Sequence, residues 1–175
     1  KYFETIADLR RRGFAVATFD WRGQGGSVRE CKNARKGHTI DFRDHDRDLV
    51  SFMKNIVLPD CPPPFVAMAH STGGNILLRN ARMESSWFER IVATAPLIRL
   101  SQKVISSPVG RGTAEWLAEL LCLVGLSEHF VPQGDEHLFE EMPFEGNPLT
   151  SDPERFRRNV QVLEAAPHLG IGSPT

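Results

Sequence analysis

Short apolar runs alternate with helical patterns through the first half of the chain. Three runs of β-branched, aromatic and small residues predict strands, at residues 14–19, 65–69 and 90–95. Apolar residues at helical spacing predict a helix before each run, over residues 2–12, 41–56 and, between the second and third strands, 75–82. This alternation is typical of a parallel sheet with right-handed crossovers. The pattern therefore predicts an α/β fold with three strands of a parallel sheet.

The second half has a different pattern. Residues 97–169 contain no convincing strand, but a helix is predicted over residues 113–124 and another from Ser151. Ser151 and Glu154 have the spacing of a capping box, and Pro153 suits a first helical turn. We therefore divide the chain into a partial α/β core, residues 1–96, and a helical insertion, residues 97–175.

The second apolar run stops at a serine between small residues. Ala69-His70-Ser71-Thr72-Gly73-Gly74 follows the strand, and helical spacing begins directly after it. A serine at such a strand-to-helix corner is held in a strained conformation that exposes its hydroxyl group, and the residues two positions away must be small. Ala69 and Gly73 satisfy that condition. We predict that Ser71 is the nucleophile of a serine hydrolase.

Two other segments raise rival hypotheses. The glycines of residues 20–27 could form a phosphate or dinucleotide loop, but the spacing is neither G-x-G-x-x-G nor G-K-[ST]. Asp41, Asp44, His45, Asp46 and Asp48 could suggest a metal site. No cysteine or second histidine lies at ligand spacing, so we favour an acidic first helical turn that complements the helix dipole. The sequence predicts no metal and no organic cofactor.

Composition narrows the class of protein. The chain has 175 residues, 41% hydrophobic residues and a formal net charge of -1, which gives no argument for nucleic-acid binding. Its three cysteines are widely spaced and predict free thiols in a reducing compartment. With no apolar run of membrane-spanning length, we expect a cytoplasmic protein, and the sequence leaves peripheral membrane contact and oligomeric state open. Because Lys1 is not an initiator methionine and the last residues are turn-rich, we expect a fragment of a longer protein.

These motifs together resemble a known family. Residues 19–27 contain Asp-x-Arg-Gly-x-Gly-x-Ser, residues 69–74 form the serine corner, and Ala95-Pro96 precedes the helices. They look like the α/β-hydrolase fold in its monoglyceride-lipase and bacterial lysophospholipase branch. Residues 147–152 and 172–175 are similar to the cap of the lysophospholipase members. The resemblance implies an α/β-hydrolase fold, here a partial parallel sheet with a helical cap insertion.

The resemblance also implies a mechanism. Ser71 would attack an ester carbonyl, and the backbone N–H of Thr72 would donate to the oxyanion. In this fold the acid and histidine follow the nucleophile on later core strands and loops. We therefore do not assign His129, His137 or His168 as the base, and we expect His70 to support the corner. Asp20 and Arg22 are expected to hold their loop through hydrogen bonds.

Three functions follow from these observations. The leading hypothesis is hydrolysis of a single-chain lipid ester, a lysophospholipid or monoacylglycerol. The alternatives are a proline-type aminopeptidase or small-ester esterase on the same fold, and a non-catalytic binding module. We expect residues 1–175 alone to be inactive and poorly soluble, because three strands leave open sheet edges. The apolar stripe Trp116, Leu117, Leu120 and Leu121 could line an acyl-chain tunnel, but we expect it to pack against neighbouring helices.

Overall fold

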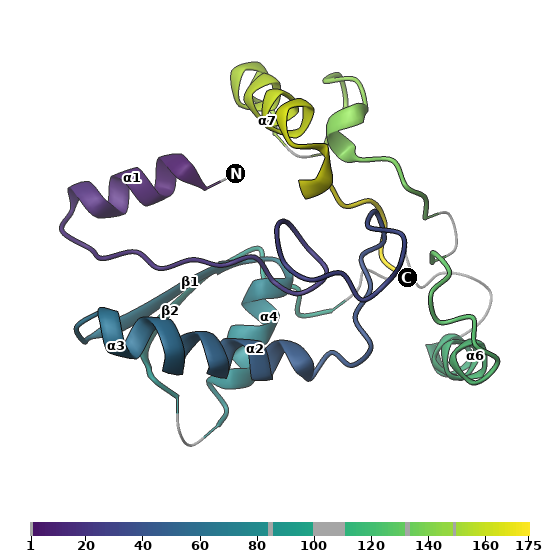
Figure 1. Ribbon diagram of the computed structural model, residues 1–175, viewed down its shortest axis with the longest axis horizontal. Coiled ribbons are helices and arrows are strands. Elements are labelled where there is room, and N and C mark those ends of the chain that lie inside the picture. The colour runs from purple at the N-terminus through teal and green to yellow at the C-terminus, as the bar shows by residue number, and fades with distance from the viewer. Residues whose placement is uncertain (1, 84–85, 100–110, 132–133, 149) are drawn as a thin grey trace. The chain divides into compact units, whose positions relative to one another are not determined.

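The computed structural model describes residues 2–83, 86–99, 111–131, 134–148 and 150–175 (Figure 1). The chain forms two compact units, Lys1–Asp41 with Glu128–Thr175, and Phe42–Ser127. These units group residues by packing, whereas the boundary at residue 96 separates segments of sequence, and that boundary stays a prediction. Within the described helices, none is both long and apolar enough to cross a membrane.

The unit Phe42–Ser127 holds the sheet. Its elements are α2 (Asp44–Phe52), which continues as a π-helical turn (Met53–Val57) and α3 (Leu58–Asp60), then β1 (Phe65–His70), α4 (Thr72–Asn80), β2 (Phe88–Thr94) and α6 (Arg111–Leu123). Asp44 and Asp46 lie in the first turn of α2, as expected for an acidic helix start. The helices and the second and third predicted strands are thus confirmed, with boundaries shifted by a few residues.

The two strands form a parallel pair, with Ala69 opposite Ala93 and His70 opposite Thr94 (Figure 1). Helix α4 covers one face of the sheet. A Cβ atom at Gly74 of this helix would lie 3.8 Å from Cβ of Ala93 in β2. Ile76 and Leu77 of this helix are buried. On the other face Val66, Met68 and Val92 are each about half exposed among the described residues. The core of this unit therefore lies between the sheet, α4 and α2.

The first predicted strand is not part of the sheet. Residues 14–19 form no strand, and the sheet of the described chain has two strands rather than three. Most of this segment is exposed, and Phe14 is 51% exposed. Residue type favours an extended chain, but a strand also needs a hydrogen-bonding neighbour. The prediction of three core strands is wrong for the residues described.

The other unit is built from helices and loops. It contains α1 (Phe3–Arg11), a 3-10 turn (Phe139–Glu141), α7 (Pro153–Ala165) and a second 3-10 turn (Pro167–Leu169). Helix α1 ends before Gly13, whose φ of +89° is accessible to glycine and confirms the predicted stop. The N-cap of α7 is Asp152, whose Oδ1 accepts hydrogen bonds from the N–H groups of Glu154 and Arg155. The predicted Ser151 cap is therefore off by one residue.

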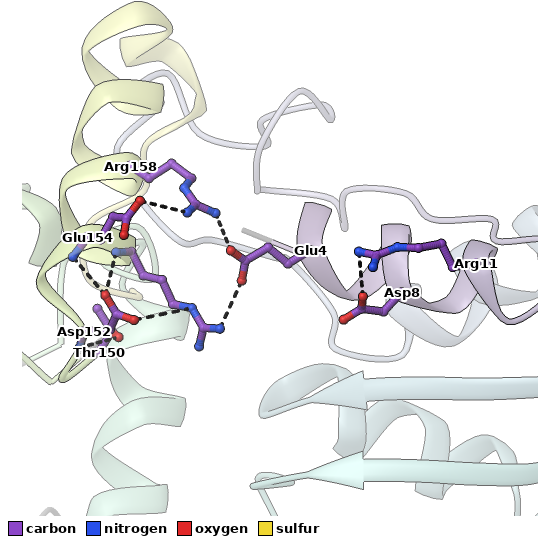
Figure 2. Close-up of polar contacts among 8 residues, drawn as sticks. Glu4, Asp8, Arg11, Thr150, Asp152, Glu154 and Arg158 are labelled. Atoms are coloured by element: carbon purple, nitrogen blue, oxygen red, sulfur yellow. Dashed lines mark hydrogen bonds and ion pairs between the residues drawn. The ribbon is translucent and has the colours of Figure 1, made fainter.

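Side-chain ion pairs connect α1 with α7 inside this unit. The carboxylate of Glu4 pairs with two arginines of α7, Nη1 of Arg158 at 2.5 Å and Nη2 of Arg155 at 3.2 Å. Figure 2 shows Glu4 pointing from α1 toward Arg158. The hydrogen bond from Arg158, with the charges of both arginines, lowers the pKa of Glu4. All three side chains are about half exposed, so this contact depends on charges that water and salt screen.

The apolar stripe of α6 is exposed. Trp116 is 61% exposed, and Leu120 and Leu121 are each 38% exposed. The expectation that this stripe packs against neighbouring helices is therefore wrong for the described residues; Leu117 lies outside the described side chains. A helical stripe shows that a face is apolar, but it does not show what covers that face.

Candidate active site

Ser71 lies at the corner between β1 and α4. Strand β1 ends at His70 and helix α4 begins at Thr72, so Ser71 alone makes the turn. Its backbone has φ +52° and ψ -122°, which places a non-glycine residue in a sparsely populated region. Such a conformation costs about 1–3 kcal/mol and persists only where the surroundings impose it. The structure therefore has the strained strand-to-helix turn that the sequence predicted.

Backbone hydrogen bonds from the next strand hold this corner. The N–H of Ser71 donates to the carbonyl of Thr94 at 3.2 Å, and the carbonyl of Ser71 accepts from the N–H of Leu97 at 3.0 Å. The N–H of Asn75 also donates to the Ser71 carbonyl, at 3.3 Å. Three partners on α4, at the end of β2 and just after it thus determine the backbone of Ser71.

Small residues let the segment after β2 approach the corner. A Cβ atom at Gly74 would lie 2.8 Å from Cβ of Pro96 and 3.1 Å from its Cα, closer than side chains approach one another. Ala95, just before this proline, has φ +42°. The segment at residues 95–97 is therefore pressed against the start of α4, and only glycine fits at position 74.

Thr72 is the first residue of α4. The first N–H groups of a helix lack acceptors within the helix, and the helix dipole adds positive potential at this end. An oxyanion formed on a carbonyl oxygen that Ser71 has attacked would thus face suitable donors. The geometry agrees with an oxyanion role for the Thr72 N–H, which stays a prediction.

The loop at residues 20–27 is held by its own polar groups. Oδ2 of Asp20 accepts from the N–H of Gly26 at 2.9 Å, and its carbonyl accepts from the Ser27 hydroxyl. Nη1 of Arg22 contacts Oε1 of Glu30 at 2.9 Å, with both side chains largely buried. The expectation that Asp20 and Arg22 hold the loop is confirmed.

The other candidate residues are dispersed. His129, His137 and His168 belong to the unit that does not contain Ser71. His137 pairs with Asp135, Nδ1 to Oδ2 at 3.3 Å, and both side chains are exposed. His70 is exposed at the end of β1. Across the described part of the chain, no group of three or more His, Cys, Asp or Glu side chains could hold a metal ion.

Asn75 belongs to the corner, although no sequence motif indicates it. Its Nδ2 donates to the carbonyl of Leu97 at 2.8 Å, so this side chain joins α4 to the segment after β2. The available signal was an asparagine four residues after the predicted nucleophile, at the start of the apolar run Ile76-Leu77-Leu78. The acceptor is a backbone carbonyl, which no sequence pattern identifies.

The arrangement of strand, strained serine and helix agrees with the comparison to known families. The profile of the family described as serine aminopeptidase, S33, matches residues 1–171. The chain belongs to this family of α/β-hydrolases. The small parallel sheet with helices is a part of that fold.

Among curated proteins, this serine aminopeptidase S33 member is similar to lysophospholipase L2 of Escherichia coli strain K12. The two are 30% identical over 182 residues, which cover 100% of this chain and 50% of the relative. A probable lysophospholipase L2 of Haemophilus influenzae is 23% identical over 175 residues, covering 100% of this chain and 53% of that protein. The chain thus spans about half the length of these curated relatives. No solved structure matches the chain.

Proposed function

We propose that Ser71 is the nucleophile of a carboxylic-ester hydrolase. The observation that carries the proposal is the backbone of Ser71, with φ +52° and ψ -122° between β1 and α4. A loop with no chemical role has no need of a strained non-glycine residue, because glycine would adopt this conformation without strain. Membership of the serine aminopeptidase S33 family supports the same role.

The reaction passes through an acyl-enzyme. Oγ of Ser71 attacks the ester carbonyl carbon, a general base takes the hydroxyl proton, and that proton then goes to the departing alkoxide. Water afterwards attacks the acyl-serine, releasing the fatty acid and restoring the hydroxyl group. The Thr72 N–H donates to the oxyanion in both steps, a contribution worth about 2.7–4 kcal/mol for one donor. The chemistry requires no metal or organic cofactor.

We assign no general base or acid within residues 1–175. In this fold these two residues follow the nucleophile on later core strands and loops. We therefore propose that residues 1–175 by themselves do not turn over esters. For the full-length protein we propose a cytoplasmic location with peripheral access to membrane lipids.

We propose a single-chain lipid ester as the substrate, either a lysophospholipid or a monoacylglycerol. Two relatives bear the name lysophospholipase L2. The exposed stripe of α6, with Trp116 at 61% and Leu120 at 38%, offers an apolar surface for one acyl chain. Burying such a chain contributes about 0.8 kcal/mol for each methylene group.

A second candidate is an aminopeptidase that releases N-terminal residues, which the description of the family favours. The same corner serves ester and amide substrates, so the corner does not distinguish them. A small-ester esterase differs from the leading proposal only in acyl length. A non-catalytic binding module keeps the fold without turnover.

The test is a substrate panel with the full-length protein. A lysophospholipid, a long-chain monoacylglycerol, a short-chain glycerol ester and a proline-containing peptide amide are compared by kcat/KM. We expect the long-chain esters to be hydrolysed fastest, and Ser71→Ala to lower their kcat by about 10⁴-fold or more. Ser27→Ala, in the loop at residues 20–27, is the matched control and should keep its rate.

Each outcome selects one function. Preference for the peptide amide would favour the aminopeptidase, and preference for the short ester would favour the esterase. No turnover by the unmodified protein would favour the binding module. Turnover that persists in Ser71→Ala would contradict the assignment of the nucleophile.

A further inference from the structure

Three hydrogen bonds form a closed ring beside the corner. The Asn75 side chain donates to the Leu97 carbonyl at 2.8 Å. The Leu97 N–H donates to the Ser71 carbonyl at 3.0 Å, and the Asn75 N–H donates to that same carbonyl at 3.3 Å. Both backbone polar groups of Leu97 are thereby tied to the corner, one directly and one through the amide of Asn75.

The ring acts on the peptide group that follows the nucleophile. The carbonyl of Ser71 and the N–H of Thr72 belong to one planar peptide unit, in which the two bonds point in opposite directions. Hydrogen bonds that fix the direction of the Ser71 carbonyl therefore fix the direction of the Thr72 N–H. This N–H is the proposed donor to the oxyanion. It stabilises the oxyanion most when it already points toward that position before the reaction begins.

We propose that Asn75 is a positioning residue that aims the Thr72 N–H by holding Leu97 against the Ser71 carbonyl. The proposal rests on the proposed function of Ser71 and assigns Asn75 no contact with the substrate. Its effect is exerted on the charged transition state, because the oxyanion exists only there. Loss of the side-chain amide should therefore lower kcat and leave KM nearly unchanged.

A role in stability alone makes a different prediction. If the amide of Asn75 only joined α4 to the segment after β2, its removal would lower the unfolding temperature without changing kcat of the folded enzyme. The Leu97 carbonyl would then accept a hydrogen bond from water, because this segment is exposed. Kinetics of the folded enzyme thus separate the two roles.

The test uses two variants in the full-length protein. Asn75→Ala removes the donor, while Asn75→Asp keeps the shape of the side chain and presents a carboxylate to the Leu97 carbonyl. We expect kcat for the long-chain ester to fall about 10-fold in both, below the 10²–10³-fold loss typical when an oxyanion donor is removed. KM should stay within about 2-fold. The control is Asn55→Asp, because Asn55 also donates a side-chain bond, to Oγ of Ser51 at 3.0 Å, but on another element.

A second measurement needs no turnover. Hydrogen exchange of the Leu97 amide reports its bond to the Ser71 carbonyl and should become faster in both Asn75 variants and not in Asn55→Asp. Should Asn75→Ala fail to fold, the isosteric Asn75→Asp carries the test.

The outcomes separate this inference from the proposed function. An active unmodified protein whose Asn75 variants keep their kcat, or whose Leu97 amide exchanges at the unmodified rate, would overturn the role of Asn75 and leave Ser71 as the nucleophile. An unmodified protein with no Ser71-dependent turnover would overturn the function itself.

Discussion

The corner at Ser71 and the unit containing the loop at residues 20–27 differ in how far charged side chains contribute to their contacts. At the corner, backbone groups of Ser71, Thr94 and Leu97 bond one another, and α4 buries Ile76 completely. In the other unit, the carboxylate of Asp20 and the ion pairs of Glu4 add charged side-chain contacts to the backbone hydrogen bonds. Backbone bonds and buried apolar groups carry no titratable charge, whereas side-chain carboxylates do.

This difference predicts that pH and salt concentration affect the two regions differently. A nucleophile has to stay in one conformation across a range of pH and salt concentration, and the structure gives Ser71 partners that do not titrate. The contact between α1 and α7 depends on the charge of Glu4, so it should respond to both conditions. The predictions below test that contrast.

Substitution of Gly74 should have the largest effect. In Gly74→Val the new side chain overlaps Pro96, since a Cβ alone would lie 2.8 Å from Cβ of that residue. We expect a loss of about 1–3 kcal/mol in the free energy of unfolding, which exceeds the few tenths gained in helix propensity. Denaturant titration measures this loss in the free energy of unfolding. Gly26→Val is the control, because a Cβ there would meet only the Asp20 carboxylate at 3.7 Å.

Substitution of Asp20 should have a smaller effect. Asp20→Ala leaves the Gly26 N–H without its acceptor, at an expected cost of about 1 kcal/mol in unfolding free energy. The rate at which a fluorophosphonate labels Ser71 should change by less than about 2-fold, because the hydrogen bonds that hold the Ser71 backbone do not involve Asp20. Asp20→Asn retains an oxygen acceptor, so its loss of unfolding free energy should be smaller. A change of more than about 2-fold in the labelling rate of Ser71 would contradict the expectation that the corner does not depend on Asp20.

Acid should weaken the contact between α1 and α7. The pKa of Glu4 is lowered by its hydrogen bond with Arg158 and by the charges of Arg155 and Arg158, from an ordinary value of 4.5. A depressed carboxyl pKa stabilises the fold fully above pH 4.5, and this contribution disappears as the pH falls through the lowered pKa. The difference in unfolding temperature between the unmodified protein and Glu4→Gln should therefore vanish in acid and at high salt. A difference that persists in acid would show that Glu4 acts without its charge.

The smallest effect concerns the start of α7. Asp152→Ala removes the acceptor of two helix N–H groups and should lower the unfolding temperature slightly. Ser151→Ala should leave it unchanged. The reverse result would restore Ser151 as the cap.

Local patterns were sufficient to predict much of the fold. The strand at β1, the serine corner and the start of α4 each follow from neighbouring residues, because small residues at 69 and 73 flank a serine between an apolar run and a helix. The helix stop at Gly13 is equally local, since it depends on one positive φ.

Interactions between distant segments were not predictable in the same way. Residues 14–19 have the composition of a strand, yet no described segment pairs with them in the sheet. The stripe of α6 has helical spacing, yet its described side chains are exposed. The bond from Asn75 to Leu97 spans 22 residues and ends on a carbonyl group, which every residue possesses. In each case the missing information was the identity of the neighbour.

Activation of Ser71 as a nucleophile can be measured directly. The most direct measurement is to treat the full-length protein with a fluorophosphonate and to locate the adduct by mass spectrometry of its peptides. We expect one adduct, on Ser71, that is absent from Ser71→Ala and present in Ser27→Ala. An unlabelled protein, or labelling that survives in Ser71→Ala, would contradict it.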